Sequence, residues 1–175
     1  MSTKRKIDIL EHSTEINKAL SKGILLTTGT MEKANTMVIG WGGIGINWTK
    51  PVFTAYIRES RYTREILDQT GEFTVNIPVK EYNQDILAVC GSKSGRDIDK
   101  IKECNLTLVE PENVETPGIK EFPMTLECRV LYRQEQELDL MGEDIPDTFY
   151  PVESDGKRDK HITYIAEITA AYVIE

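Results

Sequence analysis

The sequence contains few histidines and cysteines, which limits the metal and disulfide chemistry it can support. Its 175 residues include two histidines and three cysteines, Cys90, Cys104 and Cys128. The cysteine count is odd and no Cys-x-x-Cys pair occurs, which argues against a disulfide framework and a zinc site. We therefore expect no metal centre. Reduced thiols in a cytoplasmic protein are the simplest interpretation.

The sequence also lacks long apolar runs and an excess of positive charge. No apolar stretch reaches the length of a membrane span, and Lys4, Arg5 and Lys6 are not followed by the apolar segment of a secretory signal. The net charge is −8, so long-range repulsion disfavours nucleic acid as a partner, although one local phosphate pocket remains compatible. We expect a single domain over residues 1–175 with a substantial core, and no nucleic-acid or membrane partner.

Several motifs of common enzyme classes are absent. There is no Gly-x-Gly-x-x-Gly and no Walker loop, and Gly40, Gly42, Gly43 and Gly45 have the wrong spacing for either. No Gly-x-Ser-x-Gly elbow is found. The sequence therefore does not indicate a Rossmann enzyme, a nucleoside triphosphatase or a serine hydrolase.

The patterns that remain are mainly β with short helices. We expect a first helix that Ser13 caps and Gly23 stops, and further helices at 63–70, ended by Gly71, at 82–90 and at 97–104. Strands are expected at 24–28, 36–41, 51–57, 73–77, 124–132, 137–141 and 161–174, and the first two should form a hairpin. Gly42 and Gly43 should break the second strand and open a glycine-rich turn at 42–47. Residues 142–160 carry prolines, glycines and many charges, which predicts an exposed excursion. This order favours a small antiparallel barrel over a doubly wound sheet.

A phosphate site is suggested at the start of the helix at 63–70. Thr63 is a candidate N-cap, and Arg58, Ser60 and Arg61 precede it. A helix N-terminus offers free N–H groups, and arginine can bind phosphate with two hydrogen bonds. In the alternative interpretation, Thr63 only caps the helix and both arginines are solvated.

A second basic patch lies further along the chain. Ser94, Gly95 and Arg96 are followed by Lys100, and the glycine would let the backbone approach an anion closely. The alternative is a solvated loop. The patch gains weight only if it folds beside Thr63.

Other candidates have two interpretations each. Trp41 and Trp48 could present a face to an aromatic ligand or belong to the core. Asn35 could bind a ligand or its own turn. His161 could donate a proton or be a satisfied strand residue, and Cys90 could be a reactive thiol or a buried inert one.

Taken together, these segments resemble the flavin reductase-like, FMN-binding split-barrel family, especially its flavoredoxin-like branch. The resemblance extends from Ala19 to about Tyr172. The segments that carry it are Asn35–Trp41, Lys50-Pro51, Arg58–Thr63, Gly71–Asn76, Ser94–Lys100 and the late strand His161–Ile168.

The resemblance implies a split antiparallel barrel that forms a homodimer, with FMN near the subunit interface. Asn35 and Trp41 would line the flavin, together with the backbone of Thr36, Met37, Val38, Ile39 and Gly40. Thr63 would hold the phosphate with Arg58, Ser60 and Arg61. Lys100, with Ser94 and Arg96, would close the phosphate or ribityl side.

The function implied is that of an FMN-binding oxidoreductase. It would pass hydride or electrons from NAD(P)H through the flavin to an unidentified small-molecule or protein acceptor, without a protein nucleophile. Two alternatives are a non-catalytic FMN carrier that serves a protein partner, and a barrel that binds a different aromatic ligand or only a protein. The chain departs from the family pattern at Val38, where threonine is frequent, which puts one hydrogen bond to flavin or substrate in doubt.

Overall fold

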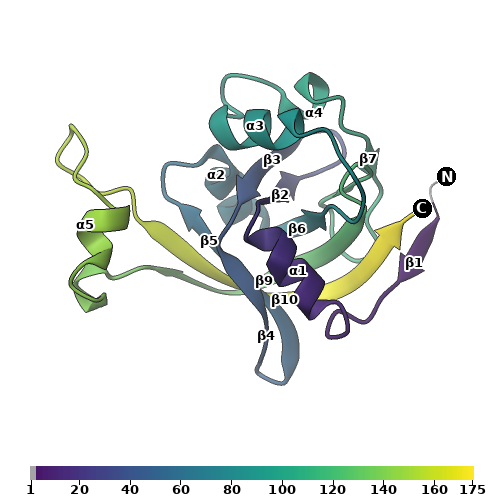
Figure 1. Ribbon diagram of the computed structural model, residues 1–175, viewed down its shortest axis with the longest axis horizontal. Coiled ribbons are helices and arrows are strands. Elements are labelled where there is room, and N and C mark those ends of the chain that lie inside the picture. Colours follow the sequence, from purple (N-terminus) through teal and green to yellow (C-terminus); the bar gives the residue numbers. More distant parts are fainter. Residues whose placement is uncertain (1–2) are drawn as a thin grey trace.

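The computed structural model describes residues 3–175, which form a curved antiparallel sheet with short helices around it (Figure 1). Along the sheet the strand order is β3-β2-β6-β9-β10-β5-β4, and β1 adds to β10. The strands are β1 (Lys4–Lys6), β2 (Ile24–Gly29), β3 (Ala34–Ile39), β4 (Gly42–Asn47), β5 (Lys50–Arg58), β6 (Glu72–Ile77), β9 (Met124–Glu135) and β10 (His161–Ile174). A separate short pair consists of β7 (Leu108–Val109) and β8 (Gly118–Ile119). The expected mainly β barrel with short helices is confirmed.

Two hairpins place the chain segments that matter for the site. β2 and β3 form the hairpin that the sequence predicted, in register from Ile24 opposite Ile39 to Gly29 opposite Ala34. β4 pairs with β5 through a tight turn at Trp48 and Thr49, both with positive φ. The apolar side chains of β5 that alternate inward are fully buried, which explains its strand character.

The helices cover different parts of this sheet (Figure 1). α1 (Ser13–Leu20) buries Ile16 and Leu20 in the main core, and α2 (Tyr62–Thr70) buries Leu67 there. α3 (Asp85–Ser92) and α4 (Lys100–Glu103) pack beside β3, and α3 also packs on β2. The left-handed Gly71 ends α2, as expected.

Three local predictions were wrong. Residues 42–47 form strand β4 instead of a turn, because Gly42 (φ +144°) lets the chain pass against the Thr54 carbonyl and rejoin the sheet. Residues 137–141 contain a short 3₁₀ helix, η1 (Leu138–Leu140), instead of a strand. The N-cap of α2 is Arg61, without a side-chain capping bond, so Thr63 is a first-turn residue and not the cap.

Residues 136–160, which we call the arm, extend away from the barrel between β9 and β10 (Figure 1). The arm contains η1 and α5 (Ile145–Phe149), and most of its residues are exposed, as predicted for 142–160. Tyr150 is the exception, because it is buried against the end of β10. Among residues 3–175, no helix has the length and apolar character needed to cross a membrane.

Candidate functional site

A groove follows the outer side of β3 and consists of two connected hollows of about 330 and 210 Å³. Both are lined by Met37, Val38 and Arg61, which makes them one continuous feature. The larger hollow lies between the start of α2 and the 90–100 segment. The smaller one lies between β3, β5 and the start of β10. We call the first the cationic end and the second the aromatic end of the groove.

The cationic end is organised around the first turn of α2. The Asn35 side-chain amide donates a 2.7 Å hydrogen bond to Thr63 Oγ1, and both residues are buried. With its oxygen accepting this bond, the Thr63 hydroxyl has its own proton left to donate, and Thr63 lines the groove. The Arg64 N–H donates to the Arg61 carbonyl at 3.0 Å, whereas the N–H groups of Tyr62 and Thr63 have no hydrogen-bond partner within residues 3–175. This end of the groove is therefore suited to an anion.

Lys100 supplies a buried cation at the same end. The residue is only 5 % exposed, and its ammonium donates to the carbonyls of Thr36 (3.0 Å) and Cys90 (2.9 Å). Burial lowers the pKa of Lys100. An ammonium has three donors, so two carbonyls hold it in place and leave a third donor for a ligand. The side chain of Thr36 points elsewhere, since its hydroxyl bonds to Thr27 and the Leu26 carbonyl.

The loop that carries Ser94 and Arg96 folds beside Thr63, so the two basic segments of the sequence do meet. The Arg96 guanidinium donates to the Ser60 carbonyl (3.1 Å) and pairs with Glu65 of α2. Gly95 lies so close to Asn35 that a Cβ there would be 2.0 Å from Asn35 Oδ1. The glycine is therefore required for the loop to close over Asn35.

Arg58 and Ser60 are engaged by the arm. The Arg58 guanidinium donates to the carbonyls of Asp159 (2.7 Å) and Phe149 (2.9 Å). The Ser60 hydroxyl and backbone N–H both donate to the Asp159 carboxylate. Arg61 differs, because within residues 3–175 its exposed side chain has no hydrogen bond or ion pair, and it lines both hollows. Of Arg58 and Arg61, Arg61 is thus the one whose guanidinium, within the part of the chain that the structure describes, is available to a ligand.

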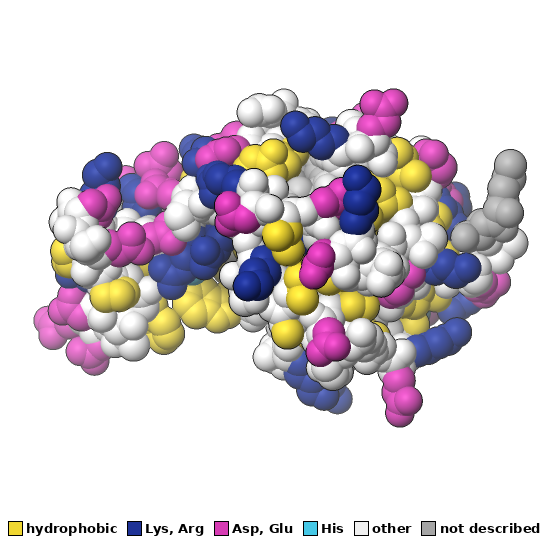
Figure 2. All heavy atoms as spheres, turned by 90° about the horizontal axis from the view of Figure 1, so that it is seen from above, with side chains coloured by type: hydrophobic (Ala, Val, Ile, Leu, Met, Phe, Trp, Pro, Cys, Tyr) yellow, Lys and Arg dark blue, Asp and Glu magenta, His cyan; other side chains and the backbone are white. Residues whose placement is uncertain are grey.

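The aromatic end is formed by Trp41 and its neighbours. Trp41 is 45 % exposed and contacts the ring of Phe149 edge-on at 5.4 Å and that of His161 at 5.0 Å between centroids. Tyr56 of β5 completes the lining. The alternative that both tryptophans belong to the core was wrong, because Trp48 is also 53 % exposed. Where the arm meets the barrel, basic and apolar side chains gather side by side (Figure 2).

His161 is a buried, satisfied residue at this end, in line with the second of its two interpretations. Its Nδ1 is 2.8 Å from the Tyr150 hydroxyl, which also lies 2.9 Å from Gln136 Oε1. Burial, with a further contribution from the Arg58 charge, lowers the pKa of His161 to about 4. The imidazole is therefore neutral near pH 7 and fixed in orientation.

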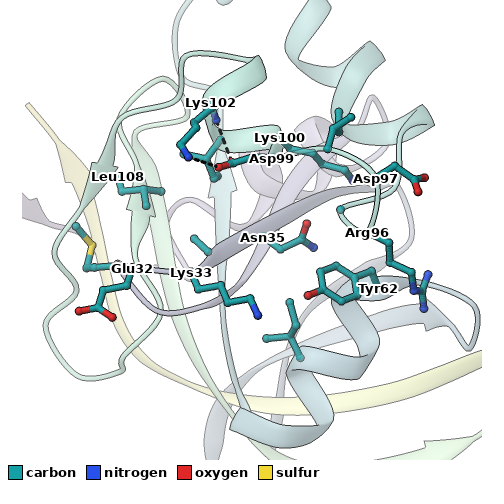
Figure 3. Close-up of a pocket in the computed structure, with 16 residues that line it drawn as sticks. Glu32, Lys33, Asn35, Tyr62, Arg96, Asp97, Asp99, Lys100, Lys102 and Leu108 are labelled. Atoms are coloured by element: carbon teal, nitrogen blue, oxygen red, sulfur yellow. Dashed lines mark hydrogen bonds and ion pairs between the residues drawn. The ribbon is translucent and has the colours of Figure 1, made fainter.

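A second cavity of about 480 Å³ lies on the other side of the Gly95 loop. Its walls come from the β2–β3 turn, α2 and the 95–102 segment, and the Tyr62 side chain extends toward it (Figure 3). Lys100 lines both this cavity and the cationic end of the groove, and Asn35 lines this cavity. Lys102 on its rim pairs with Asp99 at 3.2 Å. Asn35 thus lines this second cavity and acts on the groove through Thr63.

The structure brings twelve of the fourteen predicted site residues to the walls of the groove, while Asn35 and Thr36 lie just behind them. The twelve are Met37, Val38, Ile39, Gly40, Trp41, Arg58, Ser60, Arg61, Thr63, Ser94, Arg96 and Lys100. Sequence reasoning missed Tyr56 and Phe149. The alternation of β5 could have pointed to Tyr56, but no local signal relates Phe149 to Trp41.

The fold is an open antiparallel barrel, and its groove is cationic at one end and aromatic at the other. These features define a split-barrel protein with a site for an elongated anionic ligand. The sequence model of the flavin reductase like domain matches residues 19–175. The chain belongs to this family, which supports a flavin as its cofactor and an oxidoreductase as its broad class.

Similar proteins agree with this assignment. Flavoredoxin of Desulfovibrio vulgaris (Miyazaki F) is 25 % identical, with a TM-score of 0.65, and the match covers 86 % of this chain and 68 % of that one. Flavoredoxin from Methanosarcina acetivorans is 27 % identical, with a TM-score of 0.61 and coverage of 86 % and 67 %. An uncharacterised protein of Archaeoglobus fulgidus is 32 % identical over 143 residues, which is 81 % of this chain and 79 % of the relative.

Proposed function

We propose that this protein is an FMN-binding oxidoreductase that takes hydride from NADH or NADPH and passes electrons to a small-molecule or protein acceptor. The observation that carries the proposal is the polarity of the groove, with Thr63, Arg61 and Lys100 at one end and Trp41 at the other. FMN is a flat aromatic ring joined through a ribityl chain to a phosphate. A bound FMN would supply the hydride and electron chemistry.

The residues of this chain would bind and orient the cofactor. The Thr63 hydroxyl, held by Asn35, and the first-turn N–H groups of α2 would donate to the phosphate. Lys100 and Arg61 would balance its charge, and Ser94 and Arg96 would enclose it. The backbone from Met37 to Gly40, at the end of β3, and the Trp41 side chain would line the ring.

The aromatic end would admit the second substrate. His161 is neutral near pH 7 because the pKa of its imidazole is lowered to about 4, so it would shape this end without adding charge. The Val38 methyl groups face Gly23 and Gly91, since Cβ atoms added there would lie 3.1 and 3.4 Å from them. A threonine at this position would carry a hydroxyl in place of one methyl group. In this chain the methyl groups pack against neighbouring backbone, and no hydroxyl is present to bond to flavin or substrate.

We also propose a homodimer that works in the cytoplasm. Trp41 and Phe149 are 45 and 43 % exposed, and Leu140 on the arm is 85 % exposed, so one copy leaves apolar surface uncovered both at the aromatic end and on the arm. The three cysteines are free thiols, which suits a reducing compartment. Sedimentation equilibrium with and without FMN would test the dimer, and a monomer in both states would refute it.

The enzymatic proposal is tested by titrating the protein with FMN and then adding NADH or NADPH without oxygen. Binding is expected to quench the flavin fluorescence, and the nicotinamide is expected to bleach the visible flavin absorbance. If FMN binds but neither nicotinamide reduces it, the protein is an electron carrier that receives electrons from a protein partner. If FMN does not bind at all, the cofactor assignment is refuted.

A further inference from the structure

Two of the three cysteines lie in contact at the edge of the groove. Cys90 Sγ, in α3, is 3.8 Å from Cys104 Sγ, which directly follows α4. Cys90 is 1 % exposed, and Cys104 is half-buried. Cys128 is fully buried in β9 and its thiol bonds to the Leu126 carbonyl. The chain therefore contains one adjacent thiol pair, and one separate thiol that serves as an internal control.

The segment between the two thiols forms one wall of the groove. Residues 91–100 include Ser94, Arg96 and Lys100, which line the cationic end. Lys100 connects the two cysteines a second time, because its ammonium donates to the Cys90 carbonyl and its own carbonyl accepts from the Cys104 N–H at 3.1 Å. A change in the position of the thiol pair should therefore also shift Lys100, which is hydrogen-bonded to both cysteines.

We propose that Cys90 and Cys104 form a reversible disulfide that ties together the two ends of residues 91–103, the segment that forms one wall of the groove. A disulfide has an S–S length near 2.05 Å, so the sulfurs must approach by about 1.8 Å. α4 spans only four residues, and Cys104 directly follows it, so the bond requires a shift at the C-terminal end of this single turn. Closing a loop of this length removes freedom chiefly from the unfolded and partly open chain, which makes the oxidised form more stable.

The oxidant in this reaction is a low-molecular-weight disulfide. The Cys104 thiolate attacks one of its sulfurs, which forms a mixed disulfide and releases the first small thiol. Cys90 then attacks Cys104 Sγ, which closes the protein disulfide and releases the second small thiol. The two protein thiol protons pass through solvent to the two leaving thiolates, so one small disulfide is reduced as one protein disulfide forms.

The surroundings of the two thiols slow their oxidation near neutral pH. Burial, reinforced by the neighbouring Cys104, raises the pKa of Cys90 to about 12, and burial also raises the pKa of Cys104. Thiolate is the attacking species, so oxidation is slow near neutral pH and faster in mildly alkaline solution. The access route is Cys104, the more exposed of the two.

The experiment incubates the full-length protein with oxidised glutathione at about pH 8, where a larger fraction of the thiols is ionised. Intact mass should fall by two hydrogens, thiol titration of the unfolded product should find one free thiol, and a digest should contain a cross-linked peptide pair that joins Cys90 to Cys104. The apo-protein Tm should rise by at least about 2 °C. A thiol reductant should reverse all four changes.

Two cysteine variants make the outcome decisive. Cys104→Ser should retain two free thiols and its original Tm under the same treatment, while Cys128→Ser should still lose two hydrogens and gain Tm. A product that keeps all three thiols, a stable glutathione adduct on Cys104, or a disulfide that includes Cys128 would each overturn the proposal. Because none of these readouts involves a flavin, the result is independent of the proposed FMN chemistry.

Discussion

Replacement of Gly95 by alanine tests how the site is held together. The added Cβ would lie 2.0 Å from Asn35 Oδ1 and 2.9 Å from both Asn35 Cγ and Tyr62 Cδ1. Carbon–oxygen contacts are normally about 3.3–3.6 Å, so the Asn35 amide or the loop must move by more than about 1 Å. A movement of this size breaks the 2.7 Å bond from Asn35 to Thr63, which orients the hydroxyl in the groove.

The loss of this hydrogen bond can be converted into an expected change in the affinity for FMN. An unsatisfied buried polar group costs about 1–3 kcal/mol. If the whole cost falls on the complex, the Kd for FMN should rise roughly five- to 150-fold. The assay is a titration that follows quenching of the flavin fluorescence, with the apo-protein Tm measured in parallel. Gly45→Ala is the matched control, because a Cβ there would have no atom within 4 Å, and its Kd should equal that of the wild type.

A double-mutant cycle separates this clash from a general loss of stability. Asn35→Ser removes the amide that the new Cβ would strike. In that background Gly95→Ala should therefore have a much smaller further effect, limited to the 2.9 Å approach to Tyr62 Cδ1. Fully additive effects, or a Gly95→Ala protein that binds FMN as tightly as the wild type, would refute the view that Gly95 positions Asn35 and Thr63.

Three further predictions concern individual residues. Lys100→Ala and Thr63→Ala should each weaken FMN binding by about 1.5–3 kcal/mol, the usual size of a charge-assisted contact, whereas the exposed control Lys102→Ala should not; unchanged affinity in both would refute the phosphate assignment. Trp41→Ala should change the bound-flavin spectrum or abolish binding with little change in Tm, since the side chain is 45 % exposed; the opposite result would make Trp41 a structural residue. His161 should make stability pH-dependent: the unfolded chain protonates it below about 6.5, but the lowered pKa of about 4 prevents this in the folded protein, so the unfolding free energy should fall as pH drops from 6.5 toward 4. Urea unfolding at pH 7 and 5 should show this loss, and His161→Gln should reduce it.

The sequence predicted the parts of the fold that depend on short-range patterns. The β2–β3 hairpin, the stop of α2 at Gly71 and the long strand β10 follow from alternation and from glycine chemistry. Strand β4 was missed because three of its six residues are glycines, which weaken a strand pattern. Its pairing with β5 and the close passage of Gly42 against Thr54 are tertiary effects that no local window contains.

The candidate site was predictable in its location but not in how its charges are divided. Arg58, Ser60 and Arg61 are sequence neighbours of equal promise for a phosphate. Arg58 and Ser60 instead form hydrogen bonds with Asp159 and Phe149, about a hundred residues away in the sequence. A helix start with three nearby donors looks the same in the sequence whether those donors meet a ligand or another part of the chain.

This division of charges explains how the arm and the groove are related. Arg58 and Ser60 fix the base of the arm beside the start of α2, and this contact places Phe149 against Trp41 at 5.4 Å. The C-terminal end of β5, which leads to the cationic end of the groove, therefore also positions the aromatic end. In the proposed complex with FMN, phosphate binding falls to Arg61, Lys100 and the first turn of α2, and within residues 3–175 none of these makes a hydrogen bond or ion pair to the arm. The cationic end can therefore bind a phosphate without releasing the arm, and a change in the arm should act on the aromatic end first.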